Sequence, residues 1–241
     1  MVPHVFADRD AAAAGCAGVL AGLIDEALAA RGAAHVALNG GSTPRPVYER
    51  LPGLVGDWSG VHVWFGDERC VPPEDEESNF RLASETLVAG AGLPAERVHR
   101  MRGELGPQEG ARAYAAELAE HLSLDDAGIP VLDVVHLGMG PDGHTASLFP
   151  GHPALRVSGW ATVAVDDSPK PPPERISLSL AALNAARARV LHVVGEDKRA
   201  MLERALGEPT AEVPASLLAR ADLHVVSDGA AWTSSGDGQA P

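Results

Sequence analysis

The chain has 241 residues, a formal net charge of −14 and a 45% share of hydrophobic residues. That length fits one large α/β domain or two small ones with a substantial core. The sequence has no run of roughly 18–20 apolar residues and no signal-peptide start, so we expect a cytoplasmic protein that does not enter a membrane. The lack of a basic stripe and the scarcity of aromatic residues argue against a nucleic-acid partner. An anionic small molecule is still compatible with this charge, because a local group of cations outweighs charges beyond a Debye length of about 8 Å.

Short apolar runs typical of strands alternate with longer stretches in which apolar residues recur at three- and four-residue spacing. The predicted strands are His4–Phe6, Ala34–Leu38, Val61–Phe65, Leu132–Leu137, Trp160–Val165, Arg189–Val194 and Asp222–Val226. The predicted helices are Arg9–Arg31, Ser78–Ala89, Gln108–Leu122, Leu178–Ala188 and Lys198–Leu206. This alternation predicts an α/β fold with a doubly wound, mostly parallel, Rossmann-like sheet and helices on both faces.

The chain reads as a single domain, 1–241. We interpret the Pro-rich stretch "DDSPKPPPERIS", Asp166–Ser177, as a loop that returns to the core, because strand and helix patterns resume directly after it. The Gly/Ser-rich tail, from about residue 228 to 241, is predicted to be frayed. Cys16 and Cys70 stand in unrelated contexts, so we expect free thiols, and neither has the spacing of a zinc site.

Three loops follow predicted strands, where open parallel sheets place their ligands. The first, "ALNGGSTPRPVYERL", carries Gly40, Gly41, Ser42 and Thr43 just before a helical pattern that begins at Pro44. Glycines let backbone N–H groups turn toward a ligand, and the hydroxyl groups can donate to an oxygen, so this loop could cradle a phosphate. It matches no nucleotide-binding motif. The alternative is an ordinary capped helix start.

The second loop begins at Gly66, where "VHVWF" gives way to Asp67, Glu68 and Arg69. Arg69 could orient a substrate oxygen while Asp67 holds neighbouring groups. The alternative is a solvated cluster of ion pairs, which is the commoner role of such residues.

The third loop, "GMGPDGH", follows the near-continuous apolar run "LDVVHL" and carries Asp142 and His144. Imidazole is the side chain that titrates near neutral pH, and a carboxylate two residues away can fix its orientation and tautomer. His144 is therefore the candidate acid/base, although it could be an ordinary loop residue. The histidines beside apolar strands are expected to be structural: His35, His62, His136, His192 and His224.

Motifs for a nucleophilic serine or a metal-bound water are missing, since the sequence has neither G-x-S-x-G nor H-E-x-x-H. If the protein is a hydrolase, we expect His144 to activate water without metal or cofactor. Backbone N–H groups near Gly138–Gly140, or Arg69, would then stabilise the oxyanion that forms when water attacks a carbonyl.

Together these loops resemble the 6-phosphogluconolactonase family. The matching stretches are "NGGSTP", "FGDERCVPPEDEESNFRLASETL", "LGMGPDGHTASLFPGHP" and "PPPERISLSLAALNAARARVLHVVGEDKRAML", which span about Asn39 to Met201. The resemblance implies hydrolysis of 6-phospho-D-glucono-1,5-lactone to 6-phosphogluconate, in the oxidative pentose phosphate pathway, with no cofactor. The expected partner is thus a small sugar-phosphate lactone.

The resemblance also implies roles for individual residues. His144 would be the acid/base, supported by Asp142, with Asp67 and Arg69 at the reacting end. The phosphate would be held by Gly40, Gly41, Ser42, Thr43, Arg175 and Lys198. Without the resemblance, Arg175 and Lys198 would be interpreted as surface charges.

Two other functions stay open. Glucosamine-6-phosphate deaminase/isomerases share the Asp-Gly-His loop but follow it with a Glu-containing run, whereas this chain has "TASLFP". A non-catalytic sugar-phosphate-binding regulator would be expected to carry a DNA-binding helix pair, and no basic helix of that kind is visible. The sequence does not decide the oligomeric state, for which we expect a monomer.

Overall fold

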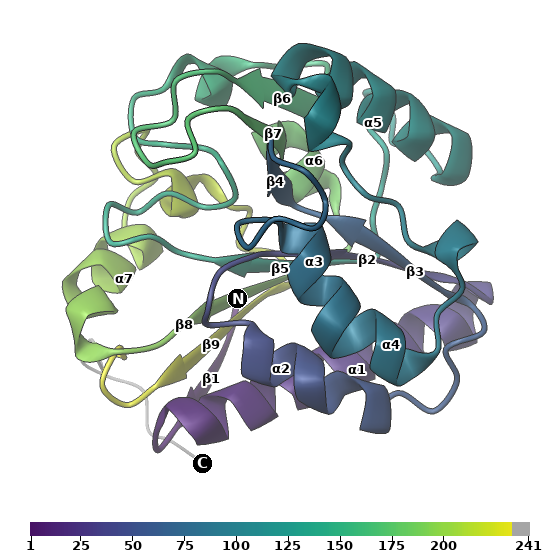
Figure 1. The fold of residues 1–241 in the computed structure, drawn as a ribbon. Coiled ribbons are helices and arrows are strands. Elements are labelled where there is room, and N and C mark those ends of the chain that lie inside the picture. Colours follow the sequence, from purple (N-terminus) through teal and green to yellow (C-terminus); the bar gives the residue numbers. More distant parts are fainter. Residues whose placement is uncertain (233–241) are drawn as a thin grey trace.

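The computed structural model describes residues 1–232, and their strands form two sheets (Figure 1). The main sheet is parallel throughout, as the near-continuous apolar runs predict. Its strands lie in the order β1 (Val2–Phe6), β9 (Leu223–Asp228), β8 (Ala188–Val193), β5 (Val134–Gly138), β2 (Ala34–Leu38) and β3 (Val61–Phe65).

The strand order reverses between β2 and β5. From β2 the chain proceeds to β3 on one side, and from β5 it proceeds to β8 and β9 on the other. The loops that leave β2 and β5 therefore diverge and leave a crevice between them, which is where doubly wound sheets bind ligands. The first and third predicted loops, after Leu38 and Gly138, begin at this point.

A second, antiparallel sheet of three short strands was not predicted. It consists of β4 (Asp67–Arg69), β7 (Arg175–Leu178) and β6 (Thr162–Val165). The segment Trp160–Val165 thus lies outside the parallel sheet, and Asp67–Arg69 is a strand and not an irregular loop. The predicted helix Leu178–Ala188 is shortened to α6 (Leu180–Ala185), because β7 continues to Leu178 and the Ser179 side chain caps the helix.

Helix α1 (Arg9–Arg31) covers one face of the main sheet, against β1, β2, β5, β8 and β9. Asp8 caps its first turn, and Gly32, with φ of 73°, ends it. Among residues 1–232 it is the one helix long and apolar enough to cross a membrane, yet it is a core helix here, since Cys16, Leu20 and Ile24 are buried against the sheet.

The opposite face lies toward the second sheet, with α5 (Pro107–His121) and α6 (Figure 1). Helix α5 packs on β6 and β7, and the Tyr114 hydroxyl bonds to the backbone of Phe65 in β3. The predicted helices Ser78–Ala89 and Lys198–Leu206 correspond to these segments: α3 (Asn79–Ala83), a π-helical turn (Ser84–Val88), α4 (Ala89–Ala91) and α7 (Arg199–Leu206). Helix α2 (Arg45–Arg50) lies against α1.

Strand β9 extends into the segment that we expected to be frayed. Asp228 is buried at its end and accepts hydrogen bonds from Gly195 N and Ala231 N. These contacts fix the chain as far as Trp232, and residues 233–241 lie outside the described part.

Candidate active site

A cavity of about 210 Å³ opens at the carboxyl ends of β2, β5 and β8. Of the residues predicted for the site, these line it: Gly40, Gly41, Thr43, Asp67, Arg69, His144, Arg175 and Lys198. Asp142 lies behind His144, and Ser42 lines an adjoining cavity of about 430 Å³ that shares Gly41 and Arg69. The three loops and the two later cations therefore meet in one place.

His144 and Asp142 form a hydrogen-bonded pair, with 2.5 Å between Nδ1 and Oδ1. That bond places the proton of the neutral ring on Nδ1 and leaves Nε2 as the basic nitrogen. Gly140 is required next to the ring, because a Cβ there would lie 2.0 Å from His144 Cε1. Phe149 packs against the ring, with 4.8 Å between centroids.

Lys170 joins this pair, which the sequence did not predict. Its Nζ is 3.3 Å from Asp142 Oδ1 and 3.2 Å from His144 Nδ1. Because Nδ1 is committed to Asp142, the ammonium donates to the carboxylate and acts on the imidazole through its charge. The Pro-rich loop interpreted as a simple connection thus supplies the third member of the group.

The pKa of His144 is lowered, first by burial and further by the Lys170 cation, and these effects outweigh the attraction of Asp142. Burial raises the pKa of Asp142, but the hydrogen bond and charge of His144, with Lys170, lower it overall. At neutral pH the pair is therefore a carboxylate and a neutral imidazole, which is the form that accepts a proton.

Asp67 is buried and fixes the loop around His144. Its Oδ2 accepts a 2.7 Å bond from Ser147 Oγ, and its Oδ1 accepts a 3.1 Å bond from Asn79 Nδ2. Asp67 thereby ties the loop after β5 to the start of α3, as its expected holding role requires. Sequence reasoning missed Ser147 and Asn79, which occur in the matched stretches but carry no signal of their own.

Arg69 is held by Glu77, whose backbone oxygen and carboxylate both accept from its Nη1. Its Nε is buried and has no hydrogen-bond partner among residues 1–232. The Arg69 side chain thus lines the cavity, while its Nε lies buried behind the surface. The expected backbone donor Gly140 is not free, because its N–H donates to His144 O at 2.9 Å. The backbone alternative for the oxyanion is wrong at that position.

Arg175 holds the Pro-rich loop through hydrogen bonds that the sequence did not predict. Its Nε donates to Pro172 O at 3.0 Å, and its Nη2 donates to Pro171 O at 3.0 Å and Lys170 O at 3.2 Å. Burial lowers the pKa of its guanidinium. Arg175 lines the cavity but chiefly holds the loop that carries Lys170.

Lys198 is the cation best placed to receive an anion. Within residues 1–232 its ammonium makes no ion pair or hydrogen bond, and burial lowers its pKa although Asp197 opposes the effect. Across the cavity, neither Ser42 nor Thr43 caps α2, whose N-cap residue is Pro44 without a side-chain bond. The ordinary-cap alternative for this loop is therefore wrong, and its hydroxyls are exposed.

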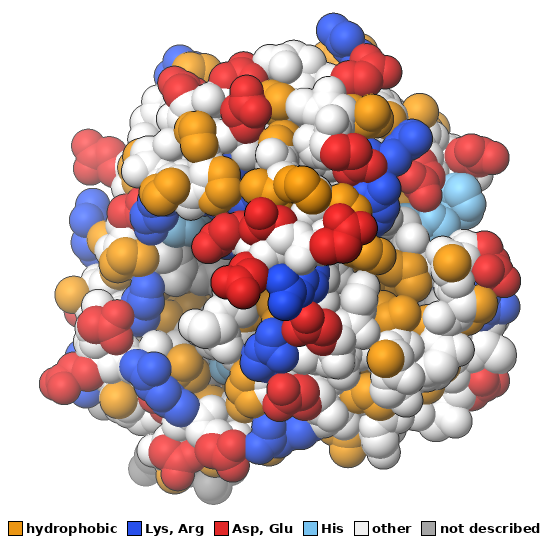
Figure 2. Space-filling view, viewed as in Figure 1, with side chains coloured by type: hydrophobic (Ala, Val, Ile, Leu, Met, Phe, Trp, Pro, Cys, Tyr) orange, Lys and Arg blue, Asp and Glu red, His pale blue; other side chains and the backbone are white. Residues whose placement is uncertain are grey.

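The surface beside the site mixes both signs of charge, as Figure 2 shows. Arg45 and Arg81 both pair with Glu85, at 3.3 Å and 2.8 Å, where the adjoining cavity opens. The acidic groups there are thus partly neutralised, and the net charge of −14 does not oppose an anion at the site.

The chain matches the family model described as glucosamine-6-phosphate isomerases/6-phosphogluconolactonase over residues 7–227. The 6-phosphogluconolactonase of Streptomyces coelicolor is 40% identical over 223 residues, which cover 88% of this chain and 85% of that protein. The human 6-phosphogluconolactonase is 38% identical over 195 residues, with coverage of 78% and 75%.

Solved structures agree with these sequence comparisons. That of 6-phosphogluconolactonase from Trypanosoma brucei aligns with a TM-score of 0.84 at 26% identity, over 95% of this chain and 97% of the other. A monomeric glucosamine-6-phosphate deaminase aligns with a TM-score of 0.80 at 18% identity, over 96% and 98%, and so shares the fold. The predicted family is confirmed: this chain belongs to the glucosamine-6-phosphate isomerase/6-phosphogluconolactonase family.

Proposed function

We propose that this protein hydrolyses 6-phospho-D-glucono-1,5-lactone to 6-phosphogluconate, in the oxidative pentose phosphate pathway. The observation that carries the proposal is the His144–Asp142 pair at a cavity that also holds Lys198, a cation with no ion-pair partner among residues 1–232. The S. coelicolor and human relatives bear the name of this enzyme. The geometry offers a base for water and a cation for the phosphate in one cavity.

The chemistry begins with water bound beside His144. His144 Nε2 removes a proton as the water oxygen bonds to C1 of the lactone, and Asp142 stabilises the imidazolium that forms. The carbonyl electrons move to oxygen, and the guanidinium of Arg69, which lines the cavity, would stabilise this oxyanion. The C1–ring oxygen bond then breaks, His144 returns its proton to the ring oxygen, and the free acid ionises.

The remaining residues bind and position the substrate. Lys198 and the Gly41–Thr43 segment would hold the phosphate, while Arg175 keeps the Lys170 loop in place. Burial, with a smaller contribution from the Lys170 charge, lowers the pKa of His144 and favours the neutral imidazole that a general base needs. No step requires a metal or an organic cofactor.

The test is a pH-stat assay of freshly generated 6-phosphogluconolactone, corrected for spontaneous hydrolysis. Acid release well above the spontaneous rate is expected, with no ammonia released from glucosamine 6-phosphate. Ammonia release would identify a deaminase. Binding of sugar phosphates without any turnover would identify a regulator.

We also propose that the enzyme acts as a monomer in the cytoplasm. In support, one chain supplies every residue invoked for the reaction. Light scattering of the purified protein and fractionation of its host cells measure the two properties.

A further inference from the structure

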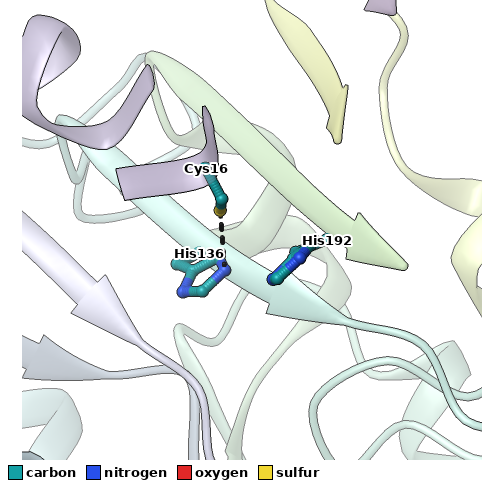
Figure 3. Close-up of side chains that lie close together, drawn as sticks. All are labelled: Cys16, His136 and His192. Carbon is teal, nitrogen blue, oxygen red and sulfur yellow. Dashed lines mark hydrogen bonds between the residues drawn. The ribbon is translucent and has the colours of Figure 1, made fainter. Parts of the chain in front are cut away.

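A second group of reactive side chains lies in the core beside the cavity. Cys16 of α1, His136 of β5 and His192 of β8 converge between that helix and the sheet (Figure 3). Cys16 and His136 are fully buried, and His192 is 3% exposed. His192 pairs with Gly138 across the strands and also lines the cavity, so the group lies directly beside the cavity wall.

The ligand atoms of these residues all lie within 4.8 Å of one another. Cys16 Sγ is 3.5 Å from His136 Nε2. A tetrahedral zinc site, with Zn–S of about 2.3 Å and Zn–N of about 2.0–2.1 Å, separates its sulfur and nitrogen ligands by about 3.6 Å. The Cys16–His136 pair therefore already has the spacing of two zinc ligands. The His192 ring stacks on His136, with 5.9 Å between centroids and 22° between the ring planes, so it has to move closer and turn to point a nitrogen at the metal.

The strongest indication of a ligand comes from His192, whose ring nitrogens lack hydrogen-bond partners in the described part of the chain. Neither of its ring nitrogens has a partner among residues 1–232, although both are buried. A buried polar group without a partner destabilises the fold, and a bound metal ion would satisfy it. His136 differs, because the Tyr48 hydroxyl lies 2.9 Å from its Nδ1, which orients Nε2 toward Cys16. Such an outer bond is typical of histidines that bind metals.

The protonation states suit a metal ligand set. Burial lowers the pKa of His192 to about 4 and that of His136 well below its usual value, so both imidazoles are neutral with a free lone pair. Burial also raises the pKa of the Cys16 thiol, so the empty group retains its S–H. A bound dication would displace that proton to solvent as the metal–sulfur bond forms.

We propose that Cys16 Sγ, His136 Nε2 and a ring nitrogen of His192 bind one zinc-class divalent cation. Thiolate and imidazole are ligands that such ions prefer, and a water molecule would complete the tetrahedral set as its fourth ligand. The three residues lie on different elements, so no spacing motif marks them. This site goes beyond the proposed lactone hydrolysis and takes no part in it.

The experiment uses chelator-stripped full-length protein, with zinc stoichiometry measured after gel filtration and cobalt(II) as a spectroscopic probe. Wild type should bind one zinc per chain, and its cobalt form should show thiolate-to-cobalt charge-transfer absorption and intense tetrahedral d–d bands. Zinc should also raise the melting temperature. A cobalt form of the wild type without the charge-transfer band, or no bound zinc, would overturn the proposal without any variant.

Variants then assign the ligands. Cys16→Ala should lose the charge-transfer band, and both it and His192→Gln should bind zinc at least a hundredfold more weakly. Cys70→Ala is the matched control, because it removes the other thiol of the chain and should bind as wild type does. Circular dichroism verifies that each variant folds. Equal zinc binding by Cys16→Ala and wild type would refute the site, whatever the lactonase assay shows.

Discussion

Lys170→Met removes the positive charge beside the catalytic pair. The ammonium is 3.2 Å from His144 Nδ1, and its side chain is 36% exposed. Two unit charges at that distance in a water-like dielectric repel by about 1.3 kcal/mol, which is close to a tenfold change in an ionisation equilibrium. Because Lys170 disfavours the imidazolium, its removal should raise the pKa of His144.

The direction of the change in the pH profile follows from the proposed role of His144 as a base. Activity is present where the imidazole is neutral and falls as the pH drops through its pKa, which in wild type is lowered below 6.5. In Lys170→Met the acid limb of the kcat/KM profile should move up by about one pH unit. At alkaline pH the variant loses no neutral base, so the difference should be concentrated on the acid side.

The assay is the pH dependence of initial rates on 6-phosphogluconolactone, with spontaneous hydrolysis subtracted at each pH. Two variants accompany it. Lys170→Arg keeps the charge and should keep the acid limb in place, while Lys198→Met removes the other lysine and should lower kcat/KM without moving the limb. An unmoved limb in Lys170→Met, or an equal movement in Lys170→Arg, would refute the electrostatic role.

Further predictions concern the other parts of the site. His144→Ala should lower kcat by about 10²–10⁴ with little change in KM, and wild-type turnover after correction would exclude it as the base. Lys198→Ala should lose roughly tenfold to a hundredfold in kcat/KM on the phosphorylated lactone but far less on glucono-1,5-lactone. Arg175→Ala should impair both lactones, since it releases the Lys170 loop. Gly140→Ala should lower kcat/KM about a hundredfold, because the new Cβ displaces the His144 ring. Gly18→Ala is the control: nothing lies within 4 Å of its new Cβ, so kcat/KM should not change. Activity should survive exhaustive treatment with EDTA, and restoration of lost activity by an added metal would contradict the metal-free mechanism.

The candidate site could be proposed from sequence because its main parts are local. At Asn39–Thr43 and at Gly138–His144, a strand is followed directly by glycines and polar residues. Parallel strands end at the same edge of the sheet, so the two loops can be expected to lie together. His144 and Asp142 are two residues apart, so their pairing was visible in the sequence. The same reasoning separated His144 from the histidines inside strands.

The second sheet could not be predicted, because strands of three or four residues carry too little periodicity. Its pairing brings Arg69 opposite Arg175, and the Pro-rich loop that precedes Arg175 carries Lys170 to the His144–Asp142 pair. That is why Lys170 was assigned to a connecting loop and Arg175 to the phosphate alone.

The sequence by itself determined the fold class and the family, and it located the loops proposed to carry the chemistry, since each depends on short stretches of contiguous residues. Tertiary structure alone decided that Lys170 reaches His144, and that Cys16, His136 and His192 meet in the core. These contacts join residues far apart in the chain. They depend on how a helix and two strands pack, which no local pattern encodes.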